Sequence, residues 1–313
     1  MSQNWKPVAI HEFKESVQNR IIWLLTVPIV LDGLMNVLTS PTAITHLGNL
    51  RYIASFQRGV GIVTPVACII LGAQAVAGAR GEGYLKTTVI QPVSRQEVLI
   101  GKAGGRAAGL SVPLSLALLI GYLHGAISGH APPVLSTVGF AAMSALYVGT
   151  LMIAMIGLSA VFKRAITPAG TAFVLGGGAF LFYDNLLPIP LKAIYGVREG
   201  SSSTGTGLSV SSAQSNAPIA ISTFLERLLP TSSYYTLTNW VLGLPNTDSL
   251  SIFIIQDLTP RVTALGVVNL SEVYSGQSVP IYLHPLISGV VLVAASAIVF
   301  LLGYISFKKS DLQ

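Results

Sequence analysis

The side chains that most often perform catalysis or bind metals are scattered along this chain. No histidine lies at metal-ligand spacing from the one cysteine, Cys68. A nucleophile elbow, Gly-x-Ser-x-Gly, is absent. A phosphate-binding loop would read G-x-x-x-x-G-K-[ST], but Gly101-Lys102 is followed by alanine and lacks the upstream glycine. We therefore predict no catalytic residue, no metal centre, no resident cofactor and no nucleotide site in this chain.

One ionisable residue lies inside a long apolar run. Asp32 follows Pro28 by one turn and precedes Gly33. A carboxylate at membrane depth is costly, so Asp32 is a candidate intramembrane functional residue. The alternative is structural, because Asp32 lies toward the outer end of its run, where water or a kinked backbone can satisfy a charge.

The most informative segment, residues 78–102, reads GARGEGYLKTTVIQPVSRQEVLIGK. Pro92 ends a first helix, because the residue before a proline avoids the α region. Ser94 is placed to cap a second helix, and Glu97 three residues later completes a capping box. Such a helix can dock a partner protein or can simply connect two spans. The residues alone leave both interpretations open.

These residues belong to a chain that is too apolar for a water-soluble domain. Of its 313 residues, 51% are hydrophobic and 10% are charged, where soluble domains have roughly 25% charged residues. The mean hydropathy is +0.67. The net charge of +6 comes from basic residues between apolar runs, a pattern typical of membrane topology signals and not of nucleic-acid binding. A single cysteine excludes a disulfide within the chain.

Six apolar runs are long enough to cross a bilayer, which takes about 20 helical residues. The fold class predicted is therefore an all-α polytopic membrane protein, a single domain over 1–313. The first 20 residues are too polar for a signal peptide, so the first run stays as a span. The predicted transmembrane helices cover 21–38, 59–79, 105–127, 134–161, 166–187 and 285–305.

The lysines and arginines predict the direction of these spans. Most of the 18 fall on one side when the amino terminus is placed in the cytoplasm, which then also holds the carboxy terminus. Residues 80–104 form a cytoplasmic loop and residues 188–284 a large extracellular loop. A Ser/Gly-rich stretch opens that outer loop. The segment that follows is apolar enough to lie on or dip into the outer leaflet, through Leu225, Leu228, Leu229 and Trp240.

Two further patterns concern packing at the cytoplasmic side. Within residues 1–20, Trp5, Ala9, Phe13 and Val17 recur at four-residue steps, which predicts an amphipathic interfacial helix in contact with membrane lipid. Small residues also recur at four-residue steps at the start of the third run and allow helix backbones to approach closely. They are Gly101, Gly105 and Gly109. Packing within the subunit is one meaning of this row, and a dimer seam is the other.

Residues 78–102 resemble the signature of exporter-type ABC transporter permeases (ABC-2-type membrane subunits), especially the NosY-like subgroup. Ala79 and Gly81 stand where that family usually has acidic residues, and Glu82 is displaced by one position. The amino-terminal helix, the six-span layout and the ending FKKSDLQ are similar to the family as well. The matching residues are Gly78, Arg80, Gly83, Leu85, Pro92, Val93, Ser94, Arg95, Val98, Leu99, Gly101 and Lys102.

This resemblance implies a coupling helix that docks on a separate ABC ATPase subunit. The expected assembly has two ATPase copies, which bind ATP and Mg. A second permease copy or a homologue accompanies this chain in the plasma membrane. Nucleic acid is not an expected partner. The expected permease dimer, with its ATPase copies, exports a substrate or acts on an extracytoplasmic partner. The expected coupling residues are Glu82, Pro92, Val93, Ser94, Arg95, Glu97 and Lys102.

The alternative is a membrane subunit without a transport role. A module for copper-enzyme maturation or an anchor of a respiratory complex are examples. Integral enzymes usually cluster His, Asp, Glu or Cys in or near their spans, and this sequence has no such cluster. An ATPase encoded beside this chain would favour the transporter.

Overall fold

The structure is a computed structural model that describes residues 5–39, 45–81, 94–162, 166–181, 217–244, 246, 270, 274 and 278–309. Regular structure within these ranges is helical, without strands, as the sequence predicts. Glu82, Pro92 and Val93 lie outside the described residues. The elements are α1 (Trp5–Gln18), α2 (Arg20–Thr39), η1 (Thr45–Leu50), α3 (Arg51–Ala54), α4 (Gln57–Gly81), α6 (Arg95–Ile127), α7 (Val134–Val161), α8 (Ile166–Leu181), α10 (Ala217–Glu226), α11 (Pro230–Val241), η3 (Ile281–Leu283) and α14 (Pro285–Lys309).

Five helices in the described part of the chain are long and apolar enough to cross a membrane. They are α2, a span over 47–78 that joins part of η1, α3 and α4, then α6, α7 and α14. The run expected at 166–187 is described only to Leu181, as the 16-residue α8. A sixth span therefore stays a prediction.

The third span and the segment that precedes it form one continuous helix. With 33 residues, α6 is about 50 Å long, whereas the hydrocarbon core of a bilayer is about 30 Å thick. The segment that begins at Arg95 is therefore continuous with the part of α6 that lies in the bundle.

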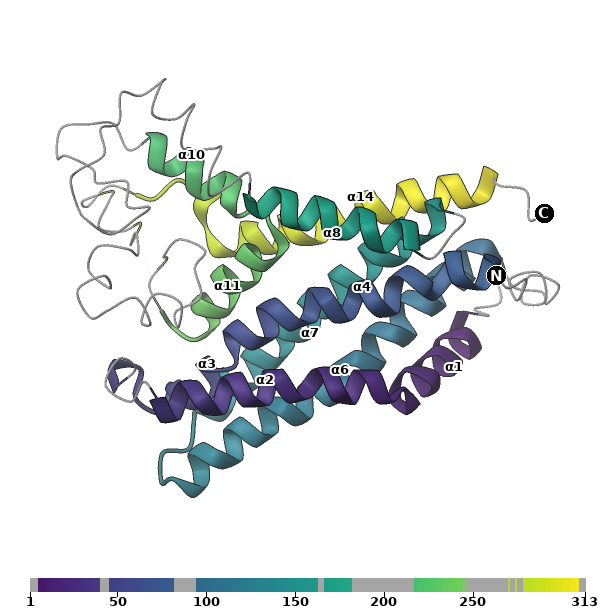
Figure 1. Cartoon of the computed structure of the whole chain (residues 1–313). Coiled ribbons are helices and arrows are strands. Elements are labelled where there is room, and N and C mark those ends of the chain that lie inside the picture. The colour runs from purple at the N-terminus through teal and green to yellow at the C-terminus, as the bar shows by residue number, and fades with distance from the viewer. Residues whose placement is uncertain are drawn as a thin grey trace.

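The long helices lie side by side in an elongated bundle (Figure 1). We call the end where α1, the start of α6 and the end of α14 come together the terminal end. The short helices α3, α10 and α11 lie toward the opposite end. Central in the bundle is α7, which packs against α4, α6, α11 and α14.

Helices α7 and α14 cross at a pair of glycines, Gly157 and Gly303. A Cβ atom on Gly303 would lie 2.6 Å from the Cα of Gly157 and would overlap its carbonyl oxygen. The two backbones therefore touch directly, as small residues permit in membrane helix pairs.

Helix α11 packs into the bundle against α4, α7 and α14. Tyr234 stacks on Tyr147 of α7 with ring centroids 4.5 Å apart, and Gln57 Nε2 of α4 donates to Thr238 Oγ1 at 2.7 Å. The sequence prediction concerned the other face of this segment, where Trp240 is exposed. The hydroxyl-rich face that packs inward was not predicted, because its residues are polar.

Candidate functional site

The start of α6 carries the capping box that the sequence predicts. Ser94 has an extended backbone and accepts a hydrogen bond from the Glu97 amide at 3.2 Å. The Ser94 amide donates in return to Glu97 Oε2 at 2.9 Å. A cap of this kind contributes about 1 kcal/mol, so the first turn of α6 is a preformed surface.

Arg95 joins the start of α6 to the end of α14. Its Nη1 donates to the carbonyl oxygens of Phe307 and Lys308 at 2.8 and 2.9 Å. The guanidinium also lies over the Phe307 ring, 5.6 Å from the centroid. Carbonyls at a helix C-terminus lack partners within the helix, and a cation there is also attracted by the negative end of the helix dipole. A substitution of Arg95 therefore affects α14 as well as any partner protein.

Glu12 of α1 is a buried carboxylate held between two cations of α6. It is 3% exposed, accepts from Arg106 Nε at 2.6 Å and pairs with Lys102. Burial raises the pKa of Glu12, but Arg106 and Lys102 outweigh that effect and leave the pKa below its ordinary value of 4.5. Arg106 Nη1 donates in addition to the Leu71 carbonyl of α4. One guanidinium thus links α1, α6 and α4.

The glycine row of α6 packs against α1. A Cβ on Gly101 would lie 2.7 Å from Val8 Cβ, one on Gly105 would lie 2.8 Å from Glu12 Cβ, and one on Gly109 would overlap Ser16. The contacts advance along both helices together, so α1 runs beside α6 in the same direction. Of the two meanings left open by the sequence, the structure shows packing within the subunit.

Gly105→Ala should lower the free energy of unfolding by about 1–3 kcal/mol, because the added methyl meets the backbone of Ala9. The matched control is Gly104→Ala on the same turn, where a Cβ meets no atom within 4 Å. That variant should be neutral or gain at most about 1 kcal/mol from helix propensity. Thermal unfolding of both purified variants provides the measurement, and equal midpoints would show that α1 does not pack on this row.

The described coupling residues contact their own chain. Lys102 pairs with Glu12, Arg95 bonds to α14 and Glu97 caps its own helix. On the first turns of α6, Gln96 and Ile100 present exposed side chains. Glu12 and Arg106 were not predicted as site residues. Their signal was the four-residue spacing of Lys102 and Arg106, which places two cations on one helix face.

Asp32 is paired at the other half of the bundle. Its Oδ1 accepts from Arg58 Nε of α4 at 3.0 Å, and Arg58 Nη2 also donates to Asn36 Oδ1 at 3.2 Å. The Asp32 Oδ2 atom is buried beside Gly59 and has no hydrogen-bond partner in the described part of the chain. The ion pair is a sufficient structural reason for a charge at this position. A functional role for Asp32 stays a prediction.

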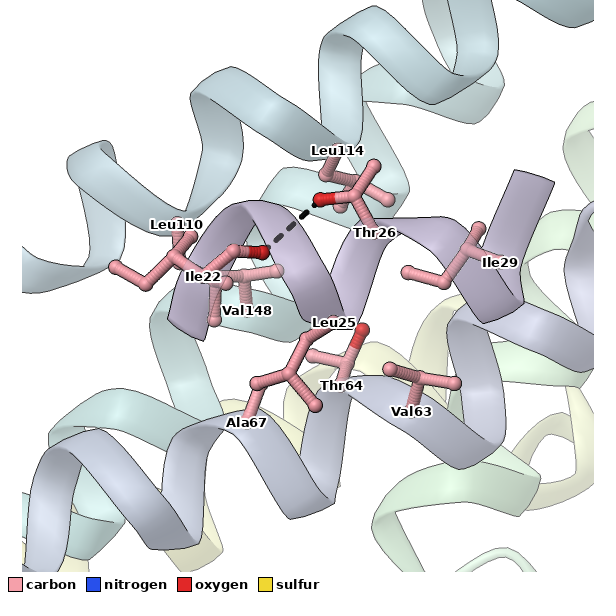
Figure 2. Close-up of a pocket in the computed structure, with 10 residues that line it drawn as sticks. All are labelled: Ile22, Leu25, Thr26, Ile29, Val63, Thr64, Ala67, Leu110, Leu114 and Val148. Carbon is pink, nitrogen blue, oxygen red and sulfur yellow. Dashed lines mark hydrogen bonds between the residues drawn. The ribbon is translucent and has the colours of Figure 1, made fainter. Parts of the chain in front are cut away.

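A small cavity near this pair is apolar. It lies among α2, α4, α6 and α7, and Figure 2 shows the Thr26 hydroxyl turned back to the Ile22 carbonyl, to which it donates at 3.1 Å. No charged side chain lines it, so it has little with which to orient a ligand. Nor do three His, Cys, Asp or Glu side chains come together in the described ranges. The lining residues are Ile22, Leu25, Thr26, Ile29, Val63, Thr64, Ala67, Leu110, Leu114 and Val148.

Comparison with known proteins identifies the family of this chain. A search of the curated proteins finds no match. The family described as ABC-2 family transporter protein matches residues 6–312, a range that includes α1 except Trp5, the capped start of α6 and all of α14. The protein is thus a multi-pass membrane protein, and the chain belongs to the ABC-2 transporter family.

Proposed function

We propose that this chain is the permease subunit of an ABC exporter and that the start of α6 docks on a separate ATPase subunit. Two ATPase copies bind ATP and Mg, and a second permease copy or a relative completes the assembly. The complex exports a substrate or acts on an extracytoplasmic partner protein, as the NosY-like resemblance of residues 78–102 implies. The family match over nearly the whole chain supports the permease role.

The observation that carries the docking proposal is the rigidity of the first turns of α6. The Ser94–Glu97 box fixes the first turn, and Arg95 ties it to α14. A surface that is already ordered loses little conformational entropy on binding. Gln96 on the first turn and Ile100 on the second turn are exposed, so they are the residues that we assign to direct contact.

We infer the orientation of the chain in the membrane from the basic residues at the terminal end. Arg95, Lys102, Arg106, Lys308 and Lys309 gather there, and basic residues near span ends face the cytoplasm. We therefore place the terminal end and both termini in the cytoplasm of a plasma-membrane protein.

Ile100→Ala should weaken association with the ATPase by about tenfold, because a buried isoleucine side chain at an interface contributes on the order of 1–2 kcal/mol more than alanine. Ile127→Ala is the matched control at the opposite end of α6, where the side chain is 86% exposed. Association is measured on complexes purified from cells that carry the protein's own ATPase. Equal affinity for both variants would exclude docking through this turn.

Thiol labelling gives an independent readout of the same surface. Cys68, the one cysteine of the sequence, is fully buried, so a cysteine introduced at Gln96 reports alone. The ATPase should slow its labelling, whereas a cysteine at Ser128, exposed beyond the far end of α6, should be labelled from outside at an unchanged rate. Labelling of Gln96→Cys from outside would overturn the orientation.

A further inference from the structure

The ion network at Glu12 connects α6 to two other helices. Arg106 uses two different nitrogens for two different helices: Nε for Glu12 of α1 and Nη1 for the Leu71 carbonyl of α4. Lys102 reaches Glu12. Among the residues of this network, Arg106 is therefore the one that the structure shows bridging to α4.

The contact between α1 and α6 leaves no room for sliding. Gly101 and Gly105 accept the backbone of α1 so closely that an added Cβ on Gly101 would lie 2.9 Å from the Trp5 carbonyl oxygen. A shift by one residue would replace Gly101 by Ile100 or Lys102 against that backbone. Close-packed interfaces are bistable and not continuously deformable, so α1 follows α6 as one body.

The link to α4 is costly to break. The Arg106 side chain is 13% exposed and that of Glu12 is 4% exposed, so separation would leave charges with little water. Breaking the hydrogen bond to the Leu71 carbonyl would leave a guanidinium nitrogen without that acceptor in a site with little access to water, which is unfavourable. The Leu71 carbonyl lies well inside α4, between Gln57 and Gly81, so a pull at that point acts on the helix as a whole.

We propose that Arg106 is a positioning residue that makes α1, α6 and α4 move as one unit when the ATPase displaces the start of α6. This inference rests on the proposed docking of α6. Arginine suits the role because its rigid fork has donors in two directions, whereas the ammonium of lysine is a compact point charge. Arg106→Lys keeps the charge beside Glu12 and removes the second donor, which reaches the Leu71 carbonyl of α4.

The test measures one distance in two nucleotide states. Spin labels are placed at His11 on α1 and Gln74 on α4, both exposed, in a Cys68→Ala background of the complex with its own ATPase. The nucleotide-free complex is compared with the complex saturated with a non-hydrolysable Mg-ATP analogue. We expect the His11–Gln74 distance to stay constant in the parent and to change in Arg106→Lys. Arg20→Lys is the control, since Arg20 is exposed, and should behave as the parent.

A second variant and a second label pair make every outcome decisive. Arg106→Met, a neutral side chain of similar length, avoids an unpaired buried charge and should also release α4. If the His11–Gln74 distance changes with nucleotide in the parent, or stays constant in both Arg106 variants, Arg106 does not hold the three helices together as one unit. Labels at Gly104, which is exposed on α6 outside the proposed docking residues, and at Tyr282 near the far end report whether nucleotide moves α6 at all. If that distance is constant, or no ATPase associates, the proposed function itself fails.

Discussion

Gly303→Ala should destabilise the folded bundle by about 3 kcal/mol, near the upper end of overpacking effects. The new methyl would lie 2.5 Å from the carbonyl carbon of Gly157 and overlap its oxygen. Backbone atoms cannot rotate out of the way as a side chain can, so α7 and α14 must move apart. Since α7 also packs against α4, α6 and α11, the separation affects the centre of the bundle.

Gly149→Ala on α7 is the matched control, because a Cβ there meets no atom within 4 Å. It should leave stability unchanged or raise it by at most about 1 kcal/mol. The fraction of monodisperse protein after heating in detergent measures both variants. A Gly303→Ala protein as stable as Gly149→Ala would contradict the observed crossing of α7 and α14.

Glu12→Ala should cost about 3–5 kcal/mol, since it leaves Lys102 and Arg106 buried without their carboxylate. Glu15→Ala is the control: Glu15 lies on the same helix but is exposed, so its loss should change stability by less than about 0.5 kcal/mol. Replacing the set by Glu12→Leu, Lys102→Met and Arg106→Met should restore much of the stability, because no charge then stays unpaired. If the triple variant is no more stable than Glu12→Ala, isolated charge is not the cause.

The same carboxylate predicts a dependence on pH. The pKa of Glu12 is lowered in the folded protein, because the attraction of Arg106 and Lys102 exceeds the effect of burial. A lowered folded-state pKa adds stability above the unfolded-state value and loses it as the pH falls through the folded-state value. Acidification below about 4.5 should therefore destabilise the parent more steeply than Glu12→Ala. Parallel slopes for the two proteins would show that the pKa of Glu12 is not lowered on folding.

The sequence by itself determined the features that depend on neighbouring residues. Apolar runs predicted α2, α4, α6, α7 and α14, since a spanning helix needs one unbroken stretch of suitable length. The capping box at Ser94 and Glu97 was predicted because its partners stand three residues apart. The resemblance to exporter-type permeases likewise came from one continuous segment, and the family match now covers residues 6–312.

Only the tertiary structure decided which residues meet across the bundle. The periodicity of residues 1–20 predicts an interfacial helix, yet Glu12 of that helix is buried against residues 90 and 94 positions away. Phe13, read as part of the apolar face, is 36% exposed. The physical reason is the solvent: lipid tails are as apolar as a protein core, so hydrophobic periodicity does not distinguish the face that packs from the face that meets lipid. Small residues and paired charges make that choice, and their partners lie far apart in the chain.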